Sequence, residues 1–104
     1  MAEKLNIYGD QGATIIETFR VLDANSNPVS LSGYTGFSQI RENYAQVNAV
    51  AAFTVSVSNT SYVTLTLSAT DSANLEAKRY VYDCEMHSDT TVLRVREGVL
   101  EIIA

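Results

Sequence analysis

The sequence predicts a single all-β domain over residues 1–104, an antiparallel sandwich of two sheets with about seven strands. Two patterns predict this class. Short runs of alternating apolar and polar residues recur along the chain, separated by clusters of Gly, Asn, Asp and Ser, and the one helical signal is a short turn near residues 69–77. With 104 residues, of which 46% are hydrophobic, the chain is long enough for one modest core.

The alternating runs give the expected strands in chain order. A short strand over residues 4–8 precedes a turn at 9–12, and a longer strand over 13–22 ends in the polar turn 23–28. An extended piece over 29–35, kinked at Gly33, leads to a strand over 36–42 and a polar loop over 43–48. The runs 50–57 and 62–67 form a hairpin through 58–61, with an apolar row on one face of each strand.

The helical signal follows that hairpin. Ser68 stands three residues before Asp71, a spacing in which the serine caps the helix N-terminus. Ala73, Leu75 and Ala77 continue the pattern for a turn or two. A piece this short needs support from packing, so we expect it to cover one end of the sandwich.

The last two strands, over residues 79–86 and 92–103, are expected to pair as a hairpin about the turn 88–91. One register brings opposite charges together on the wet side and apolar residues together on the other. It pairs His87 with Val92, Glu85 with Arg94, Asp83 with Arg96, Met86 with Leu93 and Cys84 with Val95. A bulge at Glu97 and Gly98 would then keep the later apolar residues on the core face.

The spacing Tyr82-x-Cys84 at the start of a late strand resembles the tyrosine corner of immunoglobulin domains. The partner cysteine and core tryptophan of antibody domains are missing. The spacing therefore favours an immunoglobulin-like sandwich outside the antibody family.

Composition and charge exclude several classes of partner. The net charge is −5 and the pI is about 4.6, without a basic run, so we expect neither nucleic acid nor a membrane as a partner. Residues 1–4 lack the apolar core of a signal peptide, so we expect a product that is made and kept in the cytoplasm or that leaves by a route other than a cleaved signal. Cys84 is the only cysteine, which rules out an intrachain disulfide and is consistent with a small buried side chain.

The candidates for chemistry are weak, and we expect neither an enzyme nor a cofactor. Asp23-x-Asn25-x-Asn27 resembles the start of a calcium loop, but Pro28 and Tyr34 occupy the positions that need Gly and a bidentate acid. His87 is followed by Ser88 and Asp89, yet neighbours along a strand point to opposite sides and cannot form a triad. A lone histidine is also a poor zinc site.

Two groups of residues are candidates for contact with a partner. The strand over 13–22 carries apolar residues on both faces, which suggests that Ile15, Ile16 and Phe19 meet a second copy of the chain, unless residues 5–8 cover them. Tyr34, Tyr44 and Tyr62 fall at or near expected loops. There they either stack on sugars or anchor a protein, or they cap the sandwich with buried rings.

One stretch of the sequence is especially characteristic, Pro28-Val29-x-Leu31-x-Gly33-Tyr34-Thr35 after an Asp/Asn turn. With it, the chain read end to end resembles small bacteriophage and prophage virion proteins, including the N-terminal sandwich of baseplate upper proteins and related tail or head accessory domains. The remaining matches are at residues 19–23, 40–41, 63–68, 75–82 and 97–100. Lys78 and Arg79 depart from the glycine that the family often has before its late tyrosine strand.

This resemblance implies a non-enzymatic structural protein of the virion, in the tail, baseplate or head. It would act through assembly with other virion proteins as a homo-oligomer, after synthesis in the host cytoplasm. The chain ends at Ala104, where baseplate upper proteins continue, so a standalone subunit and an excised domain both remain open. The alternative function is a carbohydrate-binding or adhesion module that uses the loop tyrosines.

Overall fold

The computed structural model describes residues 3–45 and 48–104 and confirms the all-β class with one short helix. The expected polar loop over 43–48 includes Gln46 and Val47, which lie outside the described residues. The elements are β1 (Glu3–Lys4), β2 (Ile7–Asp10), β3 (Ile15–Arg20), β4 (Thr35–Arg41), β5 (Ala51–Ser58), β6 (Tyr62–Leu67), α1 (Ala69–Ala73), β7 (Arg79–His87) and β8 (Val92–Ile103).

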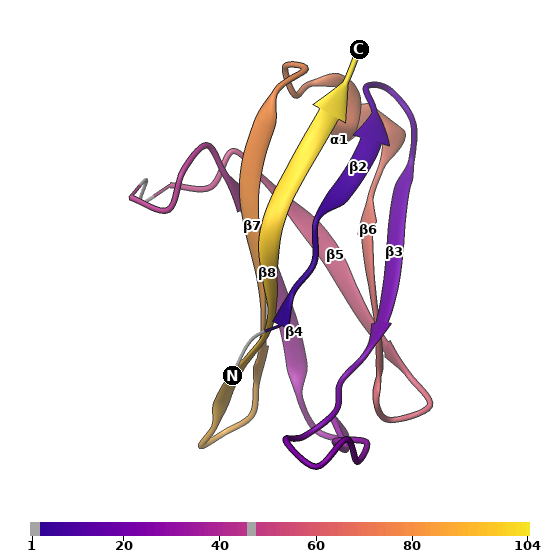
Figure 1. Ribbon diagram of the computed structural model, residues 1–104, viewed down its shortest axis with the longest axis vertical. Helices are drawn as coiled ribbons and strands as arrows, with labels where there is room; N and C mark the ends of the chain where they lie inside the picture. Colours follow the sequence, from indigo (N-terminus) through magenta and orange to yellow (C-terminus); the bar gives the residue numbers. More distant parts are fainter. Residues whose placement is uncertain (1–2, 46–47) are drawn as a thin grey trace.

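The strands form two layers joined by β5 (Figure 1). One layer contains β1, β2, β8, β7 and β4, and the other contains β6 and β3. The first residues of β5 pair with β4, whereas its residues from Thr54 onward pair with β6, so the strand crosses from one layer to the other. The side chains between the layers form one core, with Ile40, Val63, Leu65, Leu67 and Met86 all fully buried.

The N-terminal segment departs from the antiparallel pattern that the sequence suggested. Both β1 and β2 run parallel to β8, with Leu5 and Asn6 as the break between them. A Cβ atom at Gly98 would lie 2.2 Å from the carbonyl oxygen of Leu5, so the segment reaches β8 only because that residue is glycine. Gly98 therefore permits a close approach and does not form the expected bulge.

The C-terminal hairpin confirms three of the five expected pairs. His87, Met86 and Glu85 face Val92, Leu93 and Arg94 as expected. The register then shifts between Cys84 and Glu85, so Cys84 faces Arg96 and Asp83 faces Glu97. The expected pairs of Asp83 with Arg96 and of Cys84 with Val95 are therefore wrong.

The physical reason is a bulge at Val95, two to three residues before the expected one at Glu97 and Gly98. It places Val95 and Arg96 both on the buried side, 6% and 9% exposed. The guanidinium of Arg96 lies 4.3 Å from the centre of the Phe19 ring, an attraction that helps to keep this arginine inside. Asp83 pairs instead with Arg41 of β4, at 3.6 Å.

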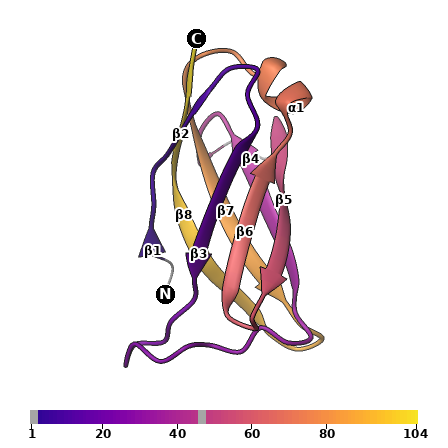
Figure 2. The ribbon, with the colours of Figure 1, turned by 90° about the vertical axis from the view of Figure 1, so that its right-hand side faces the viewer.

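The short helix is capped as expected and holds the turn between β2 and β3 (Figure 2). Ser68 accepts a hydrogen bond from the N–H of Asp71, and the helix ends at Ala73, earlier than the expected residue 77. The fully buried Ser72 accepts from the N–H of Gly12 at 3.0 Å and donates to the carbonyl of Ala13 at 2.7 Å. This contact ties α1 to the turn and closes one end of the sandwich.

A tyrosine corner is present, but at a different residue from the one the sequence suggested. The hydroxyl of Tyr80 donates to the carbonyl of Glu76, four residues earlier, at 2.9 Å. The hydroxyl of Tyr82 donates to the carbonyl of Leu5 at 2.5 Å and so secures the N-terminal segment. Tyr80 therefore makes the local corner, and Tyr82 makes a contact between distant parts of the chain.

Candidate interaction surfaces

The outer face of the β3–β6–β5 layer, which Figure 2 shows from the front, is almost free of charge. Alternation along each strand turns one set of side chains to the core and the other set to solvent. The outward set is Ile16, Thr18 and Arg20 of β3, Tyr62, Thr64 and Thr66 of β6, and Thr54, Ser56 and Ser58 of β5. We call this set the hydroxyl face.

Two side-chain contacts between β3 and β6 lie within the hydroxyl face. The hydroxyls of Thr18 and Thr64 lie 2.9 Å apart across the strand pair. The guanidinium of Arg20 lies 5.2 Å from the centre of the Tyr62 ring, and Ile16 is 62% exposed. The chain has 12 acidic residues, yet this face has none, so its outward side chains can approach another surface without desolvating a carboxylate.

One border of the hydroxyl face is an open strand edge. Among the described residues, β3 forms a ladder with β6 only. Proteins that stay monomeric usually blunt such an edge with proline, lysine or a bulge. The residues of β3 include no proline or lysine and form no bulge, but the half-buried Glu17 points to the inner side, and an inward-pointing charge is another such device.

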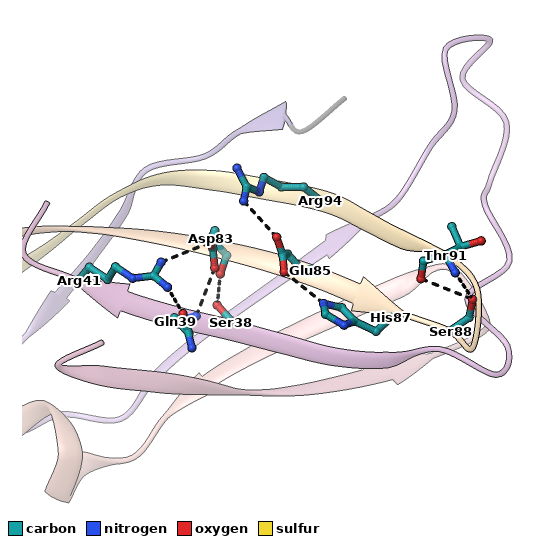
Figure 3. Close-up of polar contacts among 9 residues, drawn as sticks. All are labelled: Ser38, Gln39, Arg41, Asp83, Glu85, His87, Ser88, Thr91 and Arg94. Carbon is teal, nitrogen blue, oxygen red and sulfur yellow. Dashed lines mark hydrogen bonds and ion pairs between the residues drawn. The ribbon is translucent and has the colours of Figure 1, made fainter. Parts of the chain in front are cut away.

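The outer face of β4, β7 and β8 is charged in contrast, as Figure 3 shows. It contains a shallow hollow of about 310 Å³ lined by Phe37, Gln39, Arg41, Asp83, Glu85, His87 and Arg94. We call these residues the charged face.

Each carboxylate of the charged face lies beside a basic side chain, Arg41 for Asp83 and Arg94 for Glu85. Glu85 accepts from Arg94 at 3.0 Å and lies 3.1 Å from Nε2 of His87, whose ring packs 4.7 Å from that of Phe37. The hydrogen bond from His87, followed by that from Arg94, holds the pKa of Glu85 below its ordinary value. Reciprocally, Glu85 raises the pKa of Arg94. These pairs order the face, and each exposed pair contributes at most about 1 kcal/mol to stability.

The charged face does not assemble a nucleophile with a base. Ser88 directs its hydroxyl to the backbone of Thr91, whose N–H donates to it at 3.1 Å (Figure 3). His87 contacts Glu85 and Phe37 instead. The sequence neighbours His87, Ser88 and Asp89 therefore form no catalytic arrangement.

The structure separates the six residues expected to contact a partner. Ile15 and Phe19 are buried in the core, 5% and 6% exposed, because they lie on the inward side of β3, so neither can contribute to a contact surface. Ile16 and Tyr62 both lie on the hydroxyl face. The sequence reasoning missed the hydroxyls between them, although the alternation of Thr64 and Thr66 with buried leucines could have identified that face.

The other two tyrosines lie apart from the hydroxyl face. Tyr34 is half-buried against the core. Tyr44, in the loop after β4, is 63% exposed, and partial burial followed by the nearby charges of Glu97 and Asp83 raises its pKa. Tyr44 thus belongs beside the charged face, and the three loop tyrosines do not share one surface.

The carboxylate of Asp23 and the thiol of Cys84 both have structural roles. One carboxylate oxygen of Asp23 accepts from the N–H groups of Asn25 and Asn27, at 2.8 and 3.0 Å. Cys84 is fully buried, and that burial raises the pKa of its thiol to about 12, so the thiol is protonated at neutral pH. Within residues 3–45 and 48–104, no cluster of three potential metal ligands is found.

We therefore expect chelation to leave the fold unchanged. Addition of EDTA should not move the melting temperature in differential scanning calorimetry, because the Asp23 carboxylate already serves its own turn. A decrease of several degrees, reversed by added calcium, would show that the turn binds a metal.

Comparison with known proteins supports the fold alone. No protein-family model matches the chain, and no curated protein does. Among solved structures, the chain is similar to the crystal structure of the titin M3 domain, with a TM-score of 0.54 and 8% sequence identity. The similarity covers 97% of this chain and 90% of that one. The fold is therefore immunoglobulin-like, as the sequence predicted. Within the described residues, no helix has the length and apolar character needed to cross a membrane.

Proposed function

We propose that the chain is a non-enzymatic structural subunit that assembles with copies of itself and with other proteins. The observation that carries this proposal is the hydroxyl face, a sheet surface without acidic residues in a chain of net charge −5, next to the open edge of β3. A surface depleted of charge is the kind that protein interfaces bury at low cost.

A second copy is the occupant that this surface fits. Two acidic chains repel each other over most of their surfaces, so contact is favoured where carboxylates are absent. The open edge of β3 offers unpaired backbone groups that a two-fold related β3 can satisfy in an antiparallel pair. Ile16, 62% exposed beside that edge, would then be covered.

The resemblance to bacteriophage virion proteins suggests the setting, a tail, baseplate or head particle. The stretches that carry the resemblance fall at the end of β3, in the turn before β4 and at the end of β4, in β6 with the following Ser68, from Leu75 into β7, and in β8. Mass spectrometry of purified particles tests this part of the proposal. Peptides of this chain should be recovered in a fixed ratio to the major virion proteins, and their recovery only from the particle-free lysate would contradict a virion role.

The carbohydrate-binding alternative has less support. A sugar platform of aromatic rings needs the rings on one surface. Only Tyr44 among the three loop tyrosines is mostly exposed, and it lies on a different face from Tyr62.

Ile16→Asp tests self-association through the hydroxyl face. The substitution places a carboxylate in the contact, so the variant should be a folded monomer with an unchanged circular dichroism spectrum, as read by light scattering. Tyr8→Asp is the matched control, because Tyr8 on β2 is also 62% exposed but lies outside the hydroxyl face. It should keep the wild-type mass. Equal masses for Ile16→Asp and the wild type would exclude this face as the site of association.

A further inference from the structure

A groove separates the two layers at the end of the sandwich opposite α1. Its volume is about 440 Å³. One wall is the chain just beyond β3, and the other is the first half of β8. We call it the seam groove, and the residues that line it include Val21, Leu22, Val29, Val92, Leu93 and Arg94.

The β8 wall presents an open strand edge. On one side, residues 92–94 pair with β7. In the turn just before them, the backbone N–H of Ser88 donates to the carbonyl of Thr91 at 2.8 Å, so these two residues form a hydrogen-bonded pair. Hydrogen-bonded and non-bonded pairs alternate in an antiparallel ladder, so the N–H and C=O groups of Val92 and Arg94 point away from β7. Within the described residues, no strand pairs with that edge before Arg96.

The opposite wall is apolar and also ends in an open edge. The carbonyl of Val21 accepts from the N–H of Val29, and the N–H of Val21 donates to the carbonyl of Ser61. Both hydrogen bonds lie on the side of the chain that faces β6. The backbone of the next residue, Leu22, therefore points to the other side. Leu22 is 40% exposed, and Val29 is partly buried against the core. An apolar side chain placed in the groove would be covered from both layers.

The chain itself shows what kind of segment this edge accepts. Just beyond the groove, β1 adds to β8 as a parallel strand, with Glu3 opposite Arg96 and the N–H of Leu5 donating to Glu97 at 2.9 Å. The open edge at 92–95 continues the same side of the same strand. A segment bound there would lie in line with β1.

We propose that the seam groove accepts an extended arm of a partner protein, which adds to β8 as a parallel strand in line with β1. The backbone of the arm forms hydrogen bonds with the N–H and C=O groups of Val92 and Arg94 that point away from β7. Alternate apolar side chains of the arm pack between Leu93 and Val29. This surface is distinct from the hydroxyl face, so the inference does not depend on self-association.

The positive charge of Arg94 favours an acidic residue on the outward side of the arm. Arg94 is 53% exposed and has Glu85 as its neighbour on the β7 side. An added strand would place a side chain on the other side of Arg94, where opposite charges stabilise a cross-strand pair. The groove's one acid, Asp23, is engaged by two backbone N–H groups.

The probe is a blocked peptide, acetyl-TVEVTV-amide, titrated into the ¹⁵N-labelled full chain. We expect a dissociation constant on the order of 1 mM or below, with amide shifts concentrated at residues 92–95 and 21–24. The same peptide with its central glutamate changed to lysine should bind several-fold more weakly. A peptide with proline at its second and fourth positions should not bind, because it lacks backbone donors.

Variants of the chain separate backbone pairing from simple apolar binding. Val92→Pro removes an N–H that points to the open edge and not to β7, so the hairpin should persist while affinity falls about tenfold or more. Val92→Thr keeps the N–H and the branched shape and should bind like the wild type. The shift map of the wild type decides the question even where Val92→Pro fails to fold.

Four outcomes would overturn the proposal. They are no saturable shifts, shifts centred elsewhere, equal binding of the proline-containing peptide, or binding only to a chain shortened by residues 1 and 2. The last result would assign the edge to the chain's own first residues.

Discussion

Leu65→Asp should leave the chain unfolded at room temperature. Leu65 is fully buried at the centre of β6, so the substitution removes a large core side chain and places a carboxylate among apolar neighbours. Large-to-small changes at such sites cost about 2–5 kcal/mol, and the buried charge adds several more. The sum approaches the whole stability of a small domain, about 5–15 kcal/mol. Circular dichroism and one-dimensional NMR would detect the loss.

Thr64→Asp is the matched control for that variant. Thr64 is the preceding residue on β6 and points to the hydroxyl face, so the fold should persist with a loss of about 1 kcal/mol. A folded Leu65→Asp variant, or an unfolded Thr64→Asp variant, would mean that the inward and outward sides of β6 are the reverse of those described.

Gly98→Ala should detach the N-terminal segment from β8 and lower the free energy of unfolding by about 3 kcal/mol. The added Cβ would lie 2.2 Å from the carbonyl oxygen of Leu5, a backbone atom that cannot rotate away. Movement of Leu5 would also break the hydrogen bond from Tyr82 and expose Ile7. Urea denaturation measures the loss, and hydrogen exchange should show lost protection over residues 5–10.

Gly33→Ala separates this clash from the general cost of replacing a glycine. Gly33 has a positive φ of 83° but nothing within 4 Å of an added Cβ, so the cost should be only about 1 kcal/mol. Equal losses for the two variants would show that close approach to Leu5 is not what Gly98 permits.

Local patterns predicted the strands well, because side chains alternate between the two faces along most of each strand. The hairpin of β5 and β6, the Ser68 cap and the first half of the β7–β8 register all depend on residues close in sequence. The rest depends on contacts between distant residues. The bulge at Val95 lets Arg96 reach Phe19, and the N-terminal segment runs parallel to β8 because Gly98 admits Leu5. Neither partner is visible in the local pattern.

The candidate surface was predicted only in part, for the same reason. The two apolar sides of β3 drew attention to Ile15, Ile16 and Phe19, but only the pairing with β6 shows that Ile16 is the outward one. The strands β3, β6 and β5 lie side by side (Figure 2). The hydroxyl face exists because alternation along each of them turns one set of residues to the same outer side. Its lack of carboxylates is a property of that arrangement and not of any single stretch of sequence.

Sedimentation equilibrium of the wild-type chain over a micromolar concentration series tests the central claim most directly, namely that this protein works by self-assembly. We predict a mass that is a small multiple of 11.4 kDa and that falls toward 11.4 kDa on dilution. A mass of 11.4 kDa at every concentration would contradict it.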